Sequence, residues 1–548
     1  NQNWEDVNDG NSDNDYNDVN IQVAWTTKAP VGGTVHEDQL ETPYPGNPEA
    51  GQRLVISTEG GAGSLMALVS FGADGPGVFG LVSSETVAEV LGAQGLTSGG
   101  QPLLYSITTT TDLDGNLLST TLTATAAAEV GGYSVFTLVI NADGSFSFEF
   151  QGPIDHPRDD GDDNELWSSE GGIGLDFTQL FTATDGDGDP LQLPEGAKGL
   201  FVINIQDDVP LPAQPNPQQP VVGGLVHEDA LGSGNAEPGS EPQQTLTAEG
   251  GPRTLDALVN FGADGRGGFH LSQEPSALSG LQALGLSSGG VALFYVVSTD
   301  GTTLTATAGE GGSEVFSLVV NSDGSYLFTL KGALDHEEDG VDSETLGDNS
   351  LALDFSGVLI ATDRDGDPIA DGFASGSFVI DVEDDVPTLK PVDPQQPALG
   401  GTVHEDLLTS PNAGNPDGGT QTLVVSTEGG AGTLASLVSF GADGPGAFGL
   451  VNSGDATALL DAQELTSGGE SLLYNVVETR VDGKLVSTTL TAVSADSLGN
   501  YSVFTLTVNA DGSFHFELQG PIDHPEQSDN DSELWSSDGV FGIDFTQL

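Results

Sequence analysis

The sequence predicts an all-β protein: a tandem array of three β-sandwich repeats of about 180 residues, joined by Pro-rich linkers, with the last repeat incomplete. Three observations carry this prediction. The same short motifs return in the same order three times. Alternating apolar segments separated by Gly-, Asn- and Asp-rich turns fill each copy, and two Pro-rich stretches lie between the copies.

Recurring motifs set the repeat boundaries. V-H-E-D begins at Val35, Val226 and Val403, and F-G-A-D-G begins at Phe71, Phe261 and Phe440. We therefore expect a lead-in segment at 1–29 and repeats at 30–212, 213–390 and 391–548. The third copy reaches only the F-T-Q-L that ends at Leu548, so we expect it to lack the last loop and strand of the others. The linkers, Pro210–Pro220 and Pro387–Pro397, are expected to form semi-rigid polyproline II.

Within one copy the pattern predicts hairpins. Tyr133–Gly152 reads as two strands around an N-A-D-G turn, and Ser317–Gly332 and Phe504–Gly520 repeat it. Leu103–Ala126 reads as another hairpin, with Asp114–Gly115 at its turn. Val87–Leu96 is the best candidate for a short helix. Hairpins of this kind indicate immunoglobulin-like or cadherin-like sandwiches.

Composition excludes several classes of function. The 548 residues include 83 Asp+Glu against 11 Lys+Arg, a formal net charge of −72. Such a surface argues against nucleic-acid binding and against docking on anionic membranes. The apolar runs have the length of strands, so no membrane insertion is expected. With no Cys, the chain has no disulfide, thiolate zinc site or Cys nucleophile. It opens at Asn1 without a secretory signal peptide, and we expect a fragment or a processed product.

Clusters of acidic residues predict several calcium sites per chain, because calcium takes six to eight oxygen ligands. The first cluster lies in the lead-in segment, within an acidic W-E-D…D-x-D-Y-N-D-V pattern typical of certain secreted bacterial calcium-binding domains. Its candidate ligands are Asp9, Asn11, Asp13, Asp15 and Asp18. The second is the T-D-x-D-G-D-P loop, which occurs twice. Its candidates are Asp185, Asp187 and Asp189, then Asp363, Asp365 and Asp367.

The third cluster lies at the ends of the repeats. Two copies finish in D-D-V-P, and every copy begins near H-E-D, so carboxylates at both ends of a linker are expected to share calcium and stiffen the junction. The alternative is that each pair acts within its own repeat. The candidates are Asp207, Asp208, Asp384 and Asp385 at the ends, and Glu37, Asp38, Glu228, Asp229, Glu405 and Asp406 at the starts.

The fourth cluster is the acidic loop that follows G-[PA]-[IL]-D-H, where a D-x-E pair recurs in all three copies. The candidate ligands are Asp163, Glu165, Asp342, Glu344, Asp531 and Glu533. Asp155 and Asp176, with their counterparts in the other copies, flank this loop.

Catalysis is not expected. His36 lies in H-E-D without the second His of a zinc-protease motif, and a structural His bound to a carboxylate is the preferred interpretation of the recurring histidines. Paired carboxylates occur in glycosidases, but active sites are seldom repeated three times in one chain. We therefore predict that the protein is not an enzyme.

The order of motifs resembles the extender repeats of giant adhesins: V-H-E-D, F-G-A-D-G, N-x-D-G-S-[FY], T-D-x-D-G-D-P and D-D-V-P. These are the type-I-secreted, repeats-in-toxin adhesins and biofilm-associated proteins of Gram-negative bacteria. The resemblance spans Val31 to Leu548. It implies secretion without a cleaved signal, folding outside the cell on meeting calcium, and β-sandwich modules that contact neighbouring repeats of the same parent chain. We recognise no tip lectin and no C-terminal secretion signal in this sequence.

The leading hypothesis is therefore a structural, calcium-stabilised extender region of a secreted or cell-surface adhesin that acts in adhesion and biofilm formation. A second is a self-assembling extracellular filament of identical subunits, in which Val19–Val23 completes the third repeat of the next subunit by strand addition. A third is a glycan-binding module that recognises a host surface through Trp167 and Trp535, for which packing beneath the acidic loop is the preferred interpretation.

Overall fold

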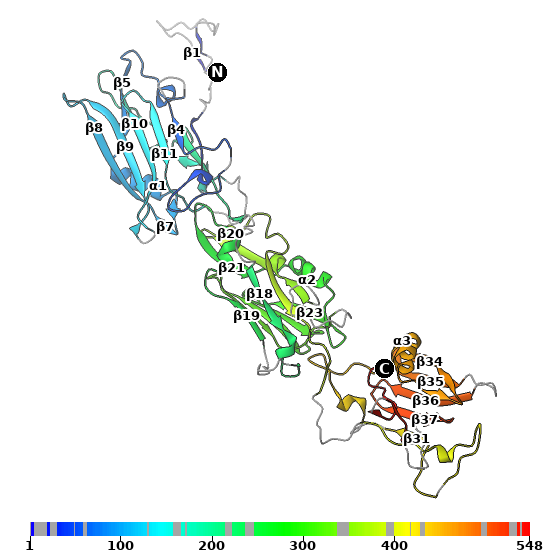
Figure 1. Cartoon of the computed structure of the whole chain (residues 1–548). Coiled ribbons are helices and arrows are strands. Elements are labelled where there is room, and N and C mark those ends of the chain that lie inside the picture. The colour runs from blue at the N-terminus through cyan, green and yellow to red at the C-terminus, as the bar shows by residue number, and fades with distance from the viewer. Residues whose placement is uncertain are drawn as a thin grey trace, which may run out of the picture.

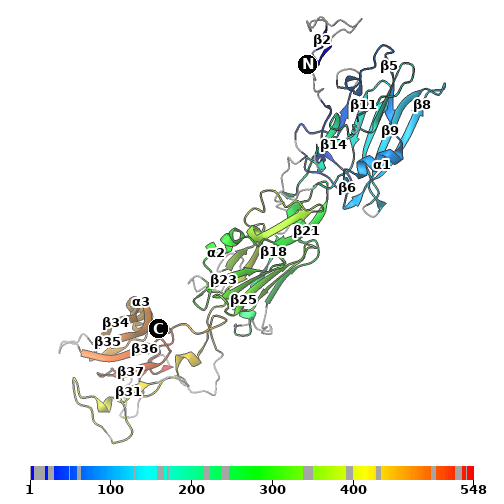
Figure 2. The same ribbon diagram turned by 180° about the vertical axis from the view of Figure 1, so that it is seen from behind.

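The computed structural model is mostly β, with several antiparallel sheets and two curled half-barrels. It describes residues 2–4, 19–21, 30–48, 50–58, 63–128, 131–156, 166–169, 172–194, 196–213, 222–235, 246–336, 350–390, 399–416, 418–427, 433–494, 501–524, 534–537 and 540–548. We call residues 30–210 the first segment, 211–387 the second and 388–548 the third. Figures 1 and 2 show the segments one after another along an extended path.

Each segment contains one large antiparallel sheet, and the three sheets share one strand order. The first, in spatial order, contains β4 (Val55–Ser57), β11 (Phe146–Phe150), β10 (Ser134–Asn141), β9 (Leu117–Thr125) and β8 (Leu104–Thr111). The second contains β19 (Leu246–Gly250), β26 (Tyr326–Leu330), β25 (Glu314–Val320), β24 (Thr303–Ala308), β23 (Val291–Val297) and β22 (Ser287–Ser288). The third contains β31 (Val424–Ser426), β37 (Phe514–Leu518), β36 (Tyr501–Asn509), β35 (Lys484–Ser494), β34 (Glu470–Val481) and β33 (Thr466–Ser467).

Smaller sheets complete the first two segments. In the first, β3 (Val31–His36) runs parallel to β16 (Phe201–Gln206), and β16 also pairs with β14 (Leu175–Asp176). A separate pair joins β5 (Pro76–Leu81) to β15 (Phe181–Asp185). In the second, β18 (Val222–His227) runs parallel to β29 (Phe378–Glu383), which also pairs with β27 (Ser350–Asp354), and β21 (Arg266–Leu271) pairs with β28 (Leu359–Asp363). Short two-residue pairs also occur: β6 (Thr97–Ser98) with β7 (Gln101–Pro102) and β12 (Ser168–Ser169) with β13 (Gly172–Ile173) in the first segment, and β38 (Ser536–Ser537) with β39 (Val540–Phe541) in the third.

The predicted hairpins are confirmed, and their turn chemistry explains them. In the β10–β11 turn the carboxylate of Asp143 accepts hydrogen bonds from the backbone N–H and the hydroxyl of Ser145. Gly144 supplies a φ of +82°, which suits a residue without a Cβ. Asp323 and Asp511 bind their serines in the same way. The N-x-D-G-S motif is therefore a turn-forming unit.

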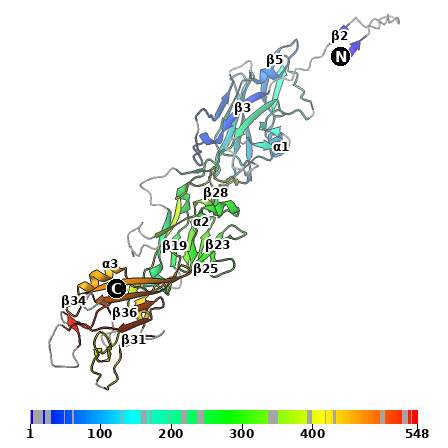
Figure 3. The ribbon, with the colours of Figure 1, turned by 90° about the vertical axis from the view of Figure 1, so that its right-hand side faces the viewer.

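The helix prediction was right in kind and wrong in its bounds. Helix α1 spans Ser84–Gly92, because the side chain of Ser83 accepts a hydrogen bond from the N–H of Thr86 and caps the helix start. Helices α2 (Ser279–Ala283) and α3 (Ser453–Asp461) occupy equivalent places in the other segments. Figure 3 shows α1, α2 and α3, one in each segment.

Three apolar cores correspond to the three segments, and the largest fully buried side chains among the described residues are Phe rings, most of them in the first two. Trp167 is only 3% exposed and packs in the first core, so its expected packing role is confirmed. Ala263 of the second segment is fully buried and belongs to the core of the first. The contact between these two segments therefore includes apolar packing.

The third segment lacks two strand pairs that the others form. Residues 399–404 and 445–450 match the sequences of β3 and β5 but form no strand. In the first segment, β3 and β5 pair with Phe201–Gln206 and Phe181–Asp185, which have no counterparts in the third. A strand without a partner has nothing to satisfy its backbone hydrogen bonds.

The start of each linker differs from the expected polyproline II. β17 (Leu211–Pro212) pairs with β20 (Val259–Asn260), and β30 (Thr388–Leu389) pairs with β32 (Val438–Ser439). Each linker thus begins as a strand laid on the following segment; residues 214–221 and 391–398 lie outside the described part.

In the lead-in segment, β1 (Gln2–Trp4) pairs with β2 (Val19–Ile21). The strand considered for exchange between subunits therefore has a local partner here. Among the described residues, no helix has the length and apolar character needed to cross a membrane.

Candidate metal centre between the first and second segments

The parallel pairing of β3 and β16 builds the first half of the site. Its register sets His36 opposite Gln206, so the residues that follow, Glu37 and Asp207, leave the sheet side by side. Glu37 opens a short 3-10 helix, Glu37–Gln39, and its Oε1 accepts a hydrogen bond from the N–H of Ile154 over 2.9 Å. Glu37 and Asp207 are 0% and 1% exposed. Two carboxylates are thus buried together at the end of the first segment.

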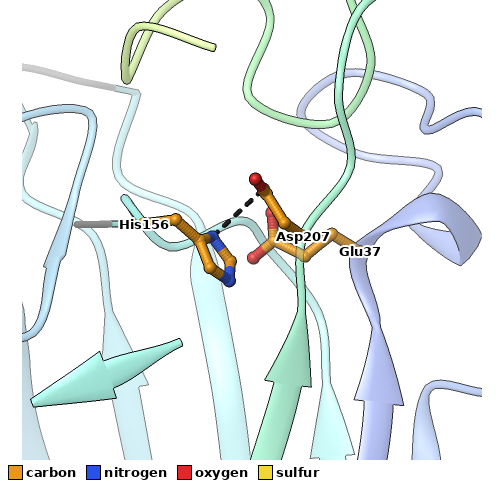
Figure 4. Close-up of side chains that lie close together, drawn as sticks. All are labelled: Glu37, His156 and Asp207. Atoms are coloured by element: carbon orange, nitrogen blue, oxygen red, sulfur yellow. Dashed lines mark ion pairs between the residues drawn. The ribbon is translucent and has the colours of Figure 1, made fainter. Parts of the chain in front are cut away.

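His156 joins them from the loop after β11. Figure 4 shows His156, Glu37 and Asp207 pointing toward one another. Nδ1 of His156 lies 3.1 Å from Oδ1 of Asp207, and Nε2 lies 3.4 Å from the carbonyl oxygen of Ile205. Burial lowers the pKa of His156, and nearby acidic charge, led by Asp365, opposes this.

The second segment adds four carboxylates. Asp264 lies in the F-G-A-D-G turn, Asp363 ends β28, and Asp365 and Asp367 follow in the T-D-x-D-G-D-P loop. They form two groups whose candidate ligand atoms lie within 4.8 Å of one another: Asp207 with Asp365 and Asp367, and Asp264 with Asp363 and Asp365. Asp207 therefore joins the two segments, and Asp365 belongs to both groups.

Direct contacts hold the segments together around these carboxylates. Oδ2 of Asp365 accepts a hydrogen bond from the N–H of His156 over 2.9 Å. Nη2 of Arg364 donates to the hydroxyl of Tyr44 over 3.1 Å, and its guanidinium carbon lies 5.4 Å from the centre of that ring. These contacts bring acidic groups together without removing their repulsion.

Burial and the nearness of other carboxylates strongly raise the pKa values of several of these acids. Burial raises the pKa of Glu37 and of Asp264 well above the usual range, and the charge of each neighbouring carboxylate adds to the effect. Burial also raises the pKa of Asp207 well above the usual range, and among its charged neighbours Asp365 adds most to this effect. Burial and the charge of Asp365 raise the pKa of Asp363 to about 11. Without a cation, burial and the neighbouring carboxylates disfavour the charged form of these groups.

The site has the chemistry that a hard divalent cation requires. Several carboxylate oxygens are buried and meet no hydrogen-bond donor among the described residues: Asp207 Oδ2, Asp264 Oδ2, Asp363 Oδ2 and Asp365 Oδ1. Leaving buried acceptors unsatisfied is costly, and calcium binds oxygen ligands of this kind. The donor set therefore fits calcium.

The contact between the second and third segments repeats the first half of this site. Glu228, His336 and Asp384 form the corresponding group, and Oε1 of Glu228 accepts from the N–H of Leu334 over 2.8 Å. Asp443 stands where Asp264 does, and burial together with the charge of Asp384 raises its pKa to about 6. No T-D-x-D-G-D-P sequence occurs in residues 388–548, and among the described residues fewer carboxylates group at this contact.

The other T-D-x-D-G-D-P loop is exposed. Asp185 and Asp187 form a group with Asp74, the counterpart of Asp264. Asp185 also accepts hydrogen bonds from the N–H groups of Gly188 and Asp189, which close the loop. The carboxylate of Asp189 belongs to none of the groups found among the described residues.

D-D-V-P and the H-E-D of the next repeat were expected to share calcium, but the structure does not bring their carboxylates into one group among the described residues. Asp207 groups with Glu37 of its own segment and with the acidic loop of the next, because parallel strands end at the same edge. No such group among the described residues pairs Asp207 with Glu228. Glu37 and Asp207 of the same repeat lie in one group, as the alternative describes, and calcium binding there stays a prediction.

The remaining acidic candidates of H-E-D and D-D-V-P make other contacts. Gln52 and Gln421 donate hydrogen bonds to Asp38 and Asp406. Glu405 Oε1 accepts from the N–H of Ile522 over 2.6 Å. Asp208 and Asp385 accept from backbone N–H groups of the following segment. Burial raises the pKa of Asp385, and the charge of Asp229 adds to this.

Two predicted clusters fall largely outside the described residues. They comprise Asp9, Asn11, Asp13, Asp15 and Asp18 of the lead-in segment, and the D-x-E pairs Asp163, Glu165, Asp342, Glu344, Asp531 and Glu533. Of the residues that flank these pairs, Asp155 accepts from the N–H groups of Gly99 and Gly100, and Asp176 accepts from Thr178 and Gly199. Asp155 and Asp176 thus stabilise turns.

Sequence reasoning missed five participants: His156, His336, Asp74, Asp264 and Asp443. Each lies in a motif that recurs in all three copies, G-[PA]-[IL]-D-H or F-G-A-D-G. Recurrence of a polar residue inside an otherwise apolar motif was the available signal. What it could not show was that the F-G-A-D-G turn faces the preceding segment.

No family model, curated protein or solved structure matches this chain.

Proposed function

We propose that the chain is a calcium-stabilised extender: consecutive β-sandwich repeats of a secreted or cell-surface bacterial adhesin, which hold an adhesive end away from the cell or build biofilm matrix. The identical strand order of the three large sheets supports the repeat architecture. The extended path in Figure 1 suits a spacer. The resemblance to Gram-negative adhesin repeats supplies the cellular setting.

The single observation that carries the proposal is the buried carboxylate group shared by Asp207, Asp365 and Asp367, in which the first segment supplies one ligand and the second supplies two. Calcium bound there replaces repulsion between segments by coordination. Because the ligands come from both segments, each bound ion favours the docked arrangement by RT ln(1 + [Ca]/Kd), about 2.7 kcal/mol at 100 times Kd.

In this mechanism the chain is flexible at low calcium concentration and becomes rigid outside the cell, where calcium is millimolar. Repulsion among carboxylates opposes docking when no cation is present, and millimolar calcium reverses the balance. The extender thus becomes stiff only where it works. The site needs no catalytic group for this role.

The test is thermal unfolding of the purified chain in chelator, in millimolar calcium and in millimolar magnesium. We expect a calcium-specific rise in Tm of several degrees. Asp365→Asn should reduce this rise sharply, because Asp365 belongs to both carboxylate groups. Glu249→Gln is the control: Glu249 is exposed and belongs to none of the carboxylate groups found among the described residues. A Tm that ignores calcium, or an equal effect of the two variants, would overturn the proposal.

A further inference from the structure

A second kind of ligand set lies beside the carboxylate groups, inside each of the first two segments. Glu37, His156 and Asp207 form it in the first, and Glu228, His336 and Asp384 form it in the second. In each case the candidate ligand atoms lie within 4.8 Å of one another. Unlike the group of Asp207, Asp365 and Asp367, each set includes a ring nitrogen and draws on one segment only.

The orientation of both histidines is that of a metal ligand. Nε2 faces a backbone carbonyl oxygen in each case, that of Ile205 at 3.4 Å for His156 and that of Val382 at 3.1 Å for His336. A metal-binding histidine usually donates one ring N–H to such an acceptor and so presents the other nitrogen to the ion. Here that other nitrogen is Nδ1.

Nδ1 faces oxygen atoms in both sets. It lies 3.1 Å from Asp207 Oδ1 in the first, and 3.4 Å from Asp384 Oδ1 and 3.0 Å from the Leu334 carbonyl in the second. A lone pair so close to anionic oxygen is repelled unless a cation or a proton lies between them. Ligands about 2.1 Å from a tetrahedral zinc ion are separated by about 3.4 Å, which matches these nitrogen–carboxylate distances.

The glutamates complete each set. Glu37 and Glu228 use Oε1 to accept a backbone N–H, which aims Oε2 inward, and Oε2 of both is buried and meets no donor among the described residues. One nitrogen and two carboxylate oxygens suit zinc, cobalt or manganese, whereas calcium prefers oxygen alone.

We propose that Glu37–His156–Asp207 and Glu228–His336–Asp384 are binding sites for a divalent transition-metal ion, distinct from the calcium groups. The ion would fasten three chain regions of one segment: the end of the first strand, the loop after the large sheet and the end of the last strand. In the first segment Asp207 belongs to both kinds of site, so the two ions lie close together. This goes beyond the extender proposal, which needs only calcium.

The third segment provides an internal comparison. Glu405 and His524 recur there, but the sequence contains no D-D-V-P counterpart of Asp207. We therefore expect two sites per chain rather than three.

The experiment measures zinc bound to the full chain in millimolar calcium, after chelation, reloading and dialysis. Wild type should retain about two zinc ions per chain, His156→Asn or His336→Asn about one, and the double variant none. His515→Asn, at an exposed position on β37, should retain both. The calcium-dependent rise in Tm should persist in the double variant, which separates this inference from the extender proposal.

X-ray absorption at the zinc edge of the wild-type protein requires no variant and should show imidazole scattering. Absence of retained zinc in the wild type, absence of imidazole scattering, or equal zinc retention in wild type and double variant would overturn the inference. Each result would assign the histidines to structural pairing with Asp207 and Asp384.

Discussion

Oδ2 of Asp208, near the end of the first segment, accepts a hydrogen bond over 2.7 Å from the backbone N–H of Ala263 in the second. The same oxygen accepts from the N–H of Asn47 over 3.1 Å. Asp385 repeats this arrangement with Ala442 and Asn235 at the next junction. The two acidic residues of D-D-V-P thus divide their roles: the first enters the acidic group and the second binds backbone of the following segment.

Asp208→Ala should weaken docking of the first two segments. It removes two hydrogen bonds to a charged acceptor, each of which contributes about 1.5–3 kcal/mol. The expected result, in saturating calcium, is a lower urea midpoint and faster protease cleavage near residues 211–222. Glu249→Ala, which removes an exposed acid elsewhere, should leave both unchanged. Equal behaviour of the two variants would show that Asp208 does not hold the junction.

Gly262→Ala tests the closeness of the same contact. Gly262 has a φ of +77°, and an added Cβ would lie 2.6 Å from Oδ2 of Asp208. We expect a loss of about 1–3 kcal/mol from backbone strain and displacement of the carboxylate. Gly285→Ala is the matched control, because its φ is +64° and its added Cβ meets nothing within 4 Å. The difference between the two unfolding free energies isolates the Asp208 contact; a difference near zero would argue against it.

The stability of the folded chain should fall as pH rises, which is the opposite of the effect that acidic residues usually have. The pKa values of Glu37, Asp207 and Asp264 are raised by burial, and that of Asp363 is raised to about 11. The folded chain therefore binds protons that the unfolded chain releases above about pH 4, so its stability falls as pH rises. In chelator, Tm should decrease steadily from pH 5 to pH 8.

Calcium should remove most of this decline, because the ion takes the place of the protons. Asp363→Asn should flatten the slope in chelator, since it deletes one of the raised groups. Glu249→Gln, at an exposed position outside the carboxylate groups found among the described residues, controls for the general effect of net charge and should leave the slope as in the wild type. A Tm in chelator that rises with pH would contradict the buried acidic group.

Arg364 and Tyr44 should be coupled energetically. The guanidinium lies over the Tyr44 ring at 5.4 Å and donates to its hydroxyl. A double-mutant cycle with Tyr44→Ala and Arg364→Ala should give a coupling of about 0.5–1 kcal/mol, because Tyr44 is 37% exposed. Arg364→Ala should also tighten calcium binding, since it removes a positive charge from the acidic loop. Calorimetry with calcium measures that second effect, and weaker binding would contradict it.

Local sequence was sufficient for the hairpins and their turns. Asp143, Gly144 and Ser145 form a turn whose hydrogen bonds lie within five residues, so the motif alone predicts it. The acidic D-x-D-G-D loop was recognisable for the same reason. The exact start of α1 was not, because a Ser83 cap competes with neighbouring polar residues that look alike in sequence.

Sequence by itself therefore determined the strand-rich character, the turns, the recurrence of motifs and the abundance of oxygen ligands. Tertiary structure decided which ligands meet. Glu37, His156, Asp207 and Asp365 are separated by 51 to 328 residues along the chain, and only the parallel β3–β16 pair and the docking of the second segment bring them together. Such contacts depend on the register and packing of distant elements, whereas a turn depends on its own residues. For this reason the sequence predicted a metal site where two repeats meet, but it did not predict which residues meet there.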